Sequence, residues 1–340
     1  MKSSQKMNTT FSINTFNQFT VKKLIKCIFS FITILVFSQF NYAASCCGGG
    51  ASSGVILPKF DDAMWDVSLS NETYDGYWNQ QGQHKDDPAG SELIQRRLNF
   101  SYAHRITEQW QVNVSLPLID NQNQYSGESS SVKGLGDTQV GLWYETFERV
   151  TCVYKITGWE SLKPSVYFGT TLTLPTGISA YGDRVENSFD ITGRGFYRWD
   201  ANIIIEKTVY PFSLGWQGSY GIAMERPVNQ EYGQAVTPYD KQLGNQATSV
   251  FSGAYTWFLP NLSMLTATLS HASLKEDKTQ YNHEKDSNSG FDKKTSGLAL
   301  AYNSSLRDWI IKLSFNQADQ GHNYPKTQTL SMGVSHVYSY

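Results

Sequence analysis

Apolar and polar residues alternate along most of the chain after residue 60. One segment shows the pattern clearly, because Val112, Val114 and Leu116 stand opposite Asn113 and Ser115. Alternation with a period of two predicts a β-strand with one apolar and one polar face. Twelve such strands are predicted, with alternating residues at positions 65–69, 94–102, 110–118, 140–145, 166–174, 199–206, 212–224, 251–257, 265–269, 298–302, 309–315 and 330–340. Each strand is about 9–13 residues long, which is enough for a tilted strand to cross a bilayer.

The last predicted strand runs to the carboxyl terminus. From Leu330 to Tyr340 one face is aliphatic and aromatic, whereas the other is mainly serine and glycine. A soluble domain must cover such an apolar face with protein, but a transmembrane β-barrel turns it toward lipid. The aromatic Tyr340 also resembles the C-terminal signal that the outer-membrane barrel-assembly machinery reads. Taken alone, this stretch is equally compatible with a half-buried edge strand.

The connections between the predicted strands alternate in length. Short ones cover residues 105–109, 207–211, 259–261 and 303–308, with a longer one on the same side at 148–162; long polar ones cover 75–92, 120–136, 175–195, 226–245, 274–293 and 318–326. Bacterial barrels have short periplasmic turns and long external loops. The alternation of short and long connections therefore predicts an all-β fold over residues 61–340. The expected architecture is a 12-stranded antiparallel transmembrane β-barrel of the outer-membrane type. Both termini then lie on the short-turn, periplasmic side.

Aromatic residues support this arrangement. Rings prefer the headgroup layer of a bilayer, so aromatic residues at one end of the strands predict a girdle there. Nine of them occupy the short-turn ends: Tyr102, Trp110, Tyr144, Phe147, Phe212, Trp257, Tyr302, Trp309 and Tyr340. The mean hydropathy of −0.40 together with 14% aromatic residues also suits strands that dilute lipid-facing residues with polar ones.

The N-terminus has the features of a secretory signal peptide. Residues 1–44 contain five lysines and no acidic residue, and the apolar run Cys27–Phe37 precedes small residues at 43–45. This pattern predicts a cleaved signal at residues 1–44, and the run is too short for a membrane-spanning helix. The remaining chain carries 23 basic and 30 acidic residues, a net charge near −7, which argues against a nucleic-acid partner. We expect the protein in the outer membrane of a Gram-negative bacterium.

Residues 45–60 are predicted to be a flexible Cys/Gly/Ser-rich periplasmic tail. The sequence before Cys46 loosely resembles a lipidation site, but such sites usually carry Leu where Ala43 stands, so ordinary signal cleavage is the preferred interpretation. If Cys46 carries a lipid, Cys47 and Cys152 remain to form a disulfide in an oxidising compartment. The Cys-Cys pair has no companion ligands at metal spacing, so no metal or other cofactor is predicted.

The predicted lumen is mostly Ser, Thr, Gly, Asn and Gln. Asp66 and six further ionisable residues are predicted to face it: Arg97, Glu145, Arg198, Asp200, Glu206 and Lys312. Unpaired buried charges are costly, so these groups should form ion pairs or line water. The wall suits either a water-filled channel or a packed polar interior.

One segment suggests an alternative chemistry. His271 and Ser273 share the outward face of the ninth strand, and an H-x-S pair resembles the spacing in outer-membrane phospholipase A and lipid A deacylases. A serine nucleophile needs an adjacent base, which this spacing can supply. Those enzymes continue with Asn-Gly, whereas Leu274 and Lys275 follow here. The competing interpretation is an interfacial His and Ser where the strand leaves the membrane.

Three stretches resemble a known family. The segments GLGDTQVGLWYE (134–145), RITEQWQVNVSLPL (105–118) and PSVYFGTTLTLPTG (164–177) are similar to outer-membrane transporters of the phenol meta-pathway (MetA) type. The resemblance implies a Gram-negative outer-membrane barrel that passes small organic molecules, and it brings no catalytic residues.

Three functions follow from these observations. The first is a channel for passive passage of small organic solutes, the second an outer-leaflet lipid hydrolase using Ser273 and His271, and the third a non-conducting structural barrel. The mixed charges of loop 274–293 indicate a solvated surface that contacts outer-membrane lipid and lipopolysaccharide. The expected partners are therefore these lipids, the assembly machinery and a small solute.

Overall fold

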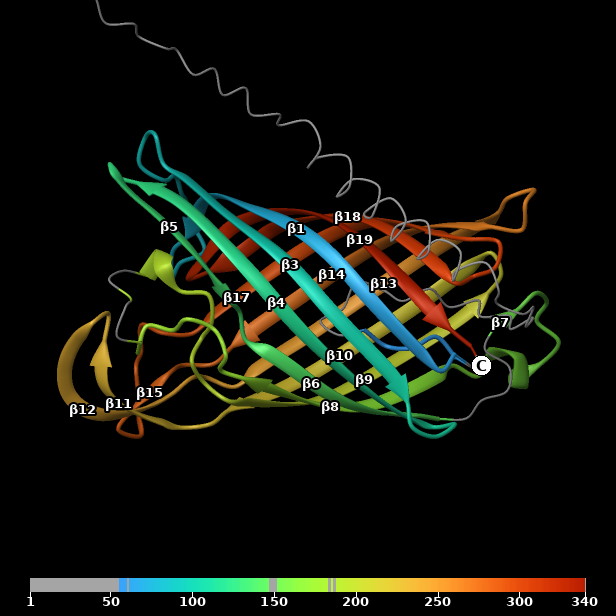
Figure 1. Ribbon diagram of the computed structural model, residues 1–340, viewed down its shortest axis with the longest axis horizontal. Helices are drawn as coiled ribbons and strands as arrows, with labels where there is room; N and C mark the ends of the chain where they lie inside the picture. The colour runs from blue at the N-terminus through green and yellow to red at the C-terminus, as the bar shows by residue number, and fades with distance from the viewer. Residues whose placement is uncertain (1–54, 60, 147–151, 183–184, 186–187, 340) are drawn as a thin grey trace, which may run out of the picture. The chain divides into compact units, whose positions relative to one another are not determined.

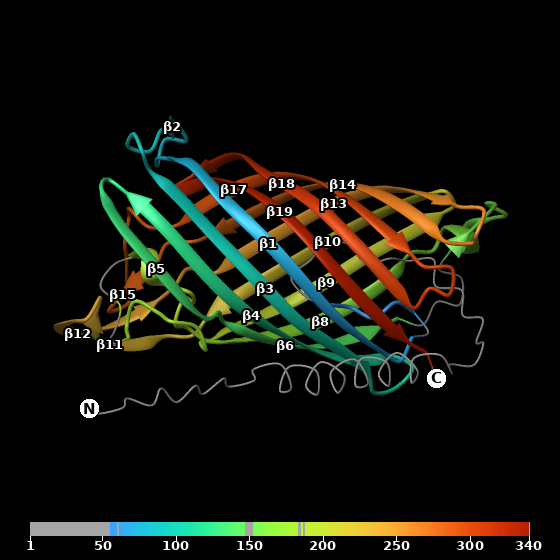
Figure 2. The same cartoon turned by 45° about the horizontal axis from the view of Figure 1, so that its top comes forward.

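The computed structural model describes residues 55–59, 61–146, 152–182, 185 and 188–339. Twelve long strands dominate it: β1 (Ala63–Trp78), β3 (Glu92–Arg105), β4 (Trp110–Tyr125), β6 (Thr138–Glu145), β8 (Ser165–Leu174), β9 (Arg198–Val209), β10 (Phe212–Ala223), β13 (Gln246–Phe258), β14 (Met264–Glu276), β17 (Phe291–Asn303), β18 (Trp309–His322) and β19 (Tyr324–Tyr338). Each pairs with its neighbours antiparallel, and β1 pairs with both β3 and β19. The ring closes as a tilted barrel (Figures 1 and 2). The predicted 12-stranded barrel is thus confirmed.

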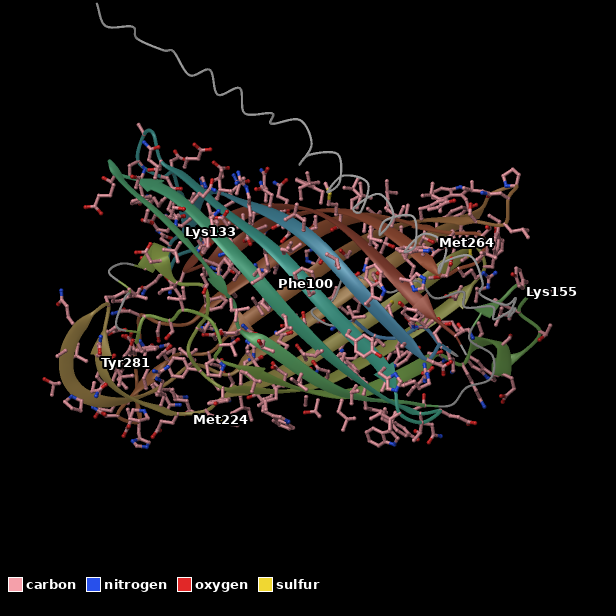
Figure 3. The ribbon with its side chains drawn as sticks, in the orientation of Figure 1. Phe100, Lys133, Lys155, Met224, Met264 and Tyr281 are labelled. Atoms are coloured by element: carbon pink, nitrogen blue, oxygen red, sulfur yellow. The ribbon has the colours of Figure 1, made fainter. Side chains whose placement is uncertain are left out.

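The apolar face of each strand is on the outside of the barrel. Leu116, Phe168, Leu269 and Met332 are exposed although they belong to well-formed strands. Figure 3 shows Phe100 midway along the barrel wall, where its side chain is also exposed. Apolar residues left in contact with water would destabilise a soluble protein, whereas in a bilayer they contact lipid.

The barrel has two different ends. The short-turn end carries the connections β3–β4, β6–β8, β9–β10, β13–β14 and β17–β18 together with β7 (Cys152–Val153) and the 3-10 helix η1 (Trp159–Leu162). The long-loop end carries β2 (His84–Lys85), the 3-10 helix η2 (Ser188–Asp190) and a separate sheet of β11 (Arg226–Glu231), β12 (Gln234–Gln242), β15 (Gln280–Tyr281) and β16 (Glu284–Lys285). Among the described residues, no helix is long and apolar enough to cross a membrane.

Three connections predicted as loops consist mainly of strands, since residues 226–245 form β11 and β12 and two further connections extend strands of the barrel. Residues 120–136 extend β4 and form β5 (Glu128–Leu135), joined by a turn in which Ser126 and Gly127 have φ of 52° and 88°. Residues 318–326 continue β18 and β19 around Asn323, whose φ is 50°. Hydrophobic alternation disappears where both faces of a strand meet water, although the backbone ladder continues. The alternation of apolar and polar residues therefore stops earlier along each strand than the backbone hydrogen bonding to the neighbouring strand.

Aromatic rings contact one another at the short-turn end. Trp65 and Trp309 pack edge to face with centroids 5.6 Å apart, and Trp110 lies 5.1 Å from Tyr144. The first contact spans β19 between β1 and β18, and the second joins the adjacent strands β4 and β6, which supports the aromatic band predicted for that end. Phe147 and Tyr340 lie outside the described residues.

Candidate functional site: a polar lumen closed at both ends

The lumen wall consists of the residues that alternate with the exposed apolar ones. The six ionisable residues predicted to line it occupy inward positions of their strands. Arg97 donates from Nη2 to Gln95 Oε1 at 2.6 Å, and Arg198 Nε lies 3.0 Å from Asp200 Oδ2. These contacts keep the charged groups hydrogen-bonded inside the barrel.

The other predicted charges also have partners across the wall. Lys312 forms an ion pair with Asp66, which also accepts a hydrogen bond from Ser335 Oγ at 2.6 Å. The Tyr167 hydroxyl donates to Glu206 at 3.3 Å. Most charged side chains of the lumen are therefore paired with other side chains of the wall. Much of the remaining inner surface is uncharged.

A chain segment enters the lumen at the short-turn end. This plug segment, residues 55–59 and 61, precedes β1, and its residues 55–59 belong to the predicted flexible tail of residues 45–60. The Leu57 backbone N–H donates to Gln111 Oε1 at 2.7 Å, and Asn113 Nδ2 donates to the Val55 carbonyl at 2.8 Å. Since Gln111 and Asn113 face inward on β4, the plug segment is hydrogen-bonded to the inner wall.

Apolar packing also holds the plug segment. Leu57 is 1% exposed and contacts the inward side chains Met64, Ala103, Ile310 and Val337. These four come from β1, β3, β18 and β19, which adjoin one another in the ring. An apolar patch inside a polar barrel would be unfavourable in contact with water, and Leu57 covers it.

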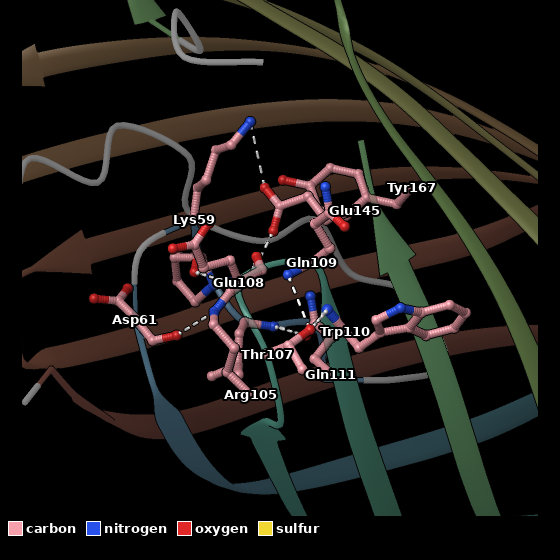
Figure 4. Close-up of polar contacts among 12 residues, drawn as sticks. Lys59, Asp61, Arg105, Thr107, Glu108, Gln109, Trp110, Gln111, Glu145 and Tyr167 are labelled. Atoms are coloured by element: carbon pink, nitrogen blue, oxygen red, sulfur yellow. Dashed lines mark hydrogen bonds and ion pairs between the residues drawn. The ribbon is translucent and has the colours of Figure 1, made fainter. Parts of the chain in front are cut away.

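A buried carboxylate fastens the same segment (Figure 4). Glu145, whose side chain is 2% exposed, lies 3.5 Å from Lys59 Nζ and 3.1 Å from Arg105 Nη1. Arg105 also donates to the carbonyls of Pro58 at 3.1 Å and Asp61 at 2.8 Å. One guanidinium therefore links the wall carboxylate to the backbone of the plug segment, and the carboxylate is paired with two cations.

Asp61 is a titratable member of this assembly. Its carboxylate accepts a hydrogen bond from Ser339 Oγ at 2.7 Å. Burial raises the pKa of Asp61 to about 6, because removing water disfavours the charged form more than the hydrogen bond favours it. The plug segment should therefore respond to mildly acidic pH.

Trp143 narrows the lumen beside the plug segment. It interrupts the polar face of its strand, and the structure places it inward and buried, opposite Gly169. A Cβ on Gly169 would lie 2.3 Å from the Trp143 ring, so this position requires glycine. The signal in the sequence was an aromatic residue on a polar face, and its glycine partner became apparent once the register was known.

A second segment closes the long-loop end. The connection between β8 and β9, residues 175–197, is called here the mouth loop. Asp137, from the Gly-Leu-Gly-Asp motif, accepts hydrogen bonds from the backbone N–H groups of Gly177 at 3.1 Å and Arg194 at 2.7 Å. A Cβ on Gly177 would lie 2.6 Å from the Gly193 Cα. The motif therefore gathers the two ends of the mouth loop beside β6.

An ion pair fixes the mouth loop to the other side of the barrel. Arg194 makes two hydrogen bonds to Glu276, at 2.5 and 2.7 Å. Glu276 ends β14, and the strands β8, β9, β10 and β13 separate β6 from β14 in the ring. The bidentate pair thus joins a loop anchored at β6 to a distant strand, across the mouth.

The mouth loop also contacts the β11–β12 hairpin. Arg226 donates to the Gly195 carbonyl at 2.6 Å, and its guanidinium lies 4.7 Å from the Tyr181 ring centroid. Lys241 lies 5.4 Å from the same centroid and 3.3 Å from Glu231. Cation–π contacts and an ion pair therefore hold the hairpin against the loop.

The residues of the hydrolase hypothesis lie on the outer face of β14. His271 Nδ1 is 3.4 Å from the Ser296 hydroxyl, which donates to Asp319 Oδ2 at 2.6 Å. Ser273 pairs in register with Ser249 and Lys294. A catalytic triad places histidine between serine and the acid, whereas here Ser296 is in the middle. This geometry supplies no oriented base for Ser273.

Asp319 had not been identified from the sequence. A β-bulge in β18 shifts the register between Lys294 and Thr295 of β17, and this brings Asp319 to Ser296. Alternation places Asp319 on the same outward face as Phe315 and Gln317, but residues 318–326 were predicted to form a loop, so no contact with Ser296 was expected. The extra residue of the bulge leaves no signal in the sequence.

Several predicted features involve residues that the structure does not describe. Cys46, Cys47 and Tyr340 lie outside the described residues, and the Cys152 side chain is not described. The lipidation site, the disulfide, the assembly signal and the signal peptide therefore stay predictions.

Comparison with known proteins identifies a structural relative. No family model matches the chain, and no curated protein matches its sequence. The COG4313 outer membrane channel from Pseudomonas putida F1 aligns with a TM-score of 0.64 and 12% identity, over 86% of this chain and 100% of that one. The Bordetella autotransporter BrkA β domain reaches 0.48 at 9% identity (82% and 100% covered), and LpxR from Salmonella typhimurium 0.39 at 9% (80% and 100%). The first likeness establishes a shared fold, whereas the lower scores support no inference.

Proposed function

We propose that the protein is an outer-membrane channel of a Gram-negative bacterium for passive passage of small organic solutes. Its short-turn end faces the periplasm and its long-loop end faces outward. The observation that carries this proposal is the closure of a polar lumen by two separate segments. A barrel that served only as a structural body could be filled by wall side chains, whereas segments fastened by a few polar contacts can move aside.

The remaining wall indicates the kind of solute. The inward positions of β10, β13, β14 and β17 include Gly215, Ser252, Ser270 and Gly297, which pair with one another in a single row across the four strands. Ser and Gly leave space and offer hydroxyl or backbone hydrogen bonds without charge. Small uncharged molecules with hydrogen-bonding groups fit this surface better than ions.

We also infer that the chain belongs with the phenol meta-pathway-type transporters. Support comes from the three resembling stretches and from the fold shared with the Pseudomonas putida channel. In this chain, two of the stretches supply contacts that close the lumen: Arg105 at the short-turn end and Asp137 at the long-loop end.

Conductance in planar bilayers tests the proposal. The full protein should open in short events at a low level, because both closures are latched. Arg194→Gln, which removes the pair with Glu276, should increase open time, whereas the control Lys133→Gln removes an exposed pair with Asp120 and should not. Liposome swelling with neutral solutes should follow the same order. A barrel that stays silent in all three forms would favour the non-conducting alternative.

A further inference from the structure

We propose that the outer wall of β13, β14 and β17 binds a phosphorylated glycolipid of the outer leaflet. The site combines an apolar groove for an acyl chain with lysines for the phosphate headgroup. This inference rests on the proposed placement of the barrel in the outer membrane. It does not require that the barrel conducts.

The groove follows the backbone hydrogen-bonding direction across the strands. Its volume is about 620 Å³, and outward side chains from β10, β13 and β14 line it (Leu214, Trp216, Phe251, Leu269 and His271), with Ile205 and Lys207 of β9 on its far side. Gly253 lies between these large side chains and faces the same way. A Cβ there would meet Leu214 Cδ2 at an ordinary 3.7 Å, so the missing side chain leaves open space.

The long-loop side of the groove becomes polar at once. Beyond Leu269, the outer face of β14 carries His271, Ser273 and Lys275 in succession. On β17 the corresponding face changes from Leu298 to Ser296 and Lys294. The apolar groove thus ends where imidazole, hydroxyl and ammonium groups begin. This change from apolar to polar side chains matches the change from acyl chain to headgroup along a lipid molecule.

Lys275 and Lys294 are placed to share one phosphate. Lys294 pairs in register with Ser273, so Lys275 is its diagonal neighbour on the adjacent strand. Diagonal pairs have Cβ atoms about 7–8 Å apart, which allows two long side chains to contact one anion. Asp292 is the register partner of Lys275, but its carboxylate contacts His322 Nδ1 at 2.9 Å.

Several lysines of the barrel have acidic partners, whereas those described near the headgroup end of the groove have none. Lys133, Lys241, Lys312 and Lys326 are paired with carboxylates. In the described part of the chain, no ion pair involves the four lysines near the headgroup end of the groove, which are Lys275, Lys278, Lys285 and Lys294. Three of them line a polar hollow of about 380 Å³ together with Asp277 and Glu276, the latter already paired with Arg194. In a chain of net negative charge, uncompensated lysines at this position favour an anionic partner.

Native mass spectrometry of the full protein in detergent tests the site with three probes: lipid A bisphosphate, phosphatidylglycerol and phosphatidylethanolamine. We expect preferential retention of lipid A. The double variant K275Q/K294Q should lower that retention at least about tenfold, since each lysine near a lipid surface contributes about 1 kcal/mol. Gly253→Leu, which fills the groove, should lower it about fivefold through lost acyl contact.

Matched controls separate the site from general effects. K133Q/K326Q removes two paired lysines at the same end, and Ala267→Leu adds bulk to the same outer face outside the groove; both should retain lipid A as the unmodified protein does. K275R/K294R should restore binding, and a heat-dependent gel shift reports folding. Equal retention of phosphatidylglycerol, or unchanged retention in K275Q/K294Q, would overturn the proposal. Loss of lipid with unaltered conductance supports the site, whereas a silent but lipid-retaining barrel contradicts the channel function alone.

Discussion

The two closures of the lumen are built differently. The plug segment is held by backbone hydrogen bonds, by apolar packing of Leu57 and by Glu145, which is almost fully buried. The mouth loop depends on glycine contacts and on the pair of Arg194 with Glu276, in which the arginine side chain is 43% exposed and the glutamate side chain 3%. Exposed pairs are weakened by water and salt, whereas buried ones are not. The plug should therefore be the firmer closure and the mouth loop the one that opens first.

Removal of the buried carboxylate should have the largest effect. Glu145→Ala removes the carboxylate that Lys59 and Arg105 both contact in a site that excludes water, which should lower the free energy of unfolding by about 3–5 kcal/mol. It should also release the plug segment and raise conductance. Urea titration in detergent and bilayer recording measure the two effects. Glu108→Gln, at an exposed turn position, is the control, and equal results for both variants would contradict the role of Glu145.

Loss of the mouth latch should have a smaller effect on stability. Arg194→Gln removes two hydrogen bonds between charged groups, each of which contributes about 1.5–3 kcal/mol when shielded and less at this half-exposed site. Open time should rise, and high salt should produce a similar change in the unmodified protein but little further change in Arg194→Gln, which has no pair left to screen. If salt affects both closures alike, the proposed difference in burial does not control gating.

The next largest effect is expected when the close contact between Gly177 and Gly193 in the mouth loop is disturbed. Gly177→Ala places a Cβ 2.6 Å from the Gly193 backbone, which cannot shift without moving the mouth loop. Overpacking of this kind costs about 1–3 kcal/mol. Increased protease sensitivity of the mouth loop should accompany it. Gly158→Ala, which meets nothing within 4 Å, should leave both properties unchanged.

The smallest effect should be a pH dependence at the plug. Because burial raises the pKa of Asp61 from 3.8 to about 6, the folded state favours the protonated form. Its contribution to stability is therefore complete below pH 3.8 and is lost as pH rises through about 6. Conductance should fall as pH decreases from 7 to 5, and Asp61→Asn should flatten this profile. An identical profile in that variant would assign the dependence to other groups.

Much of the barrel was predictable from residue types. Trp110–Leu118 and Leu330–Tyr338 alternate clearly because one face of each strand meets lipid and the other meets the polar lumen. The extension through β5 was not predicted, since Ser129, Ser130 and Ser131 are polar on both faces and carry no periodic signal. Strand continuation beyond the membrane depends on backbone pairing, which residue polarity does not report.

The candidate site was predictable only in part. Glu145 and Lys312 were identified as inward charges, but their partners Arg105 and Asp66 became known from the register and the closed ring. The contact of Leu57 with Gln111 joins residues 54 positions apart, and Arg194 with Glu276 joins residues 82 apart. Such distant pairs leave no local pattern in the chain.

The sequence by itself determined the number of strands, their order and the face that each turns outward, because lipid and water impose a period of two on every membrane-spanning strand. The tertiary structure alone decided that the lumen is closed at both ends, that Asp319 meets Ser296 at a bulge and that Lys275 and Lys294 lie above one apolar groove. Those features arise when the sheet curves and closes, since closure brings together side chains that the linear order keeps apart.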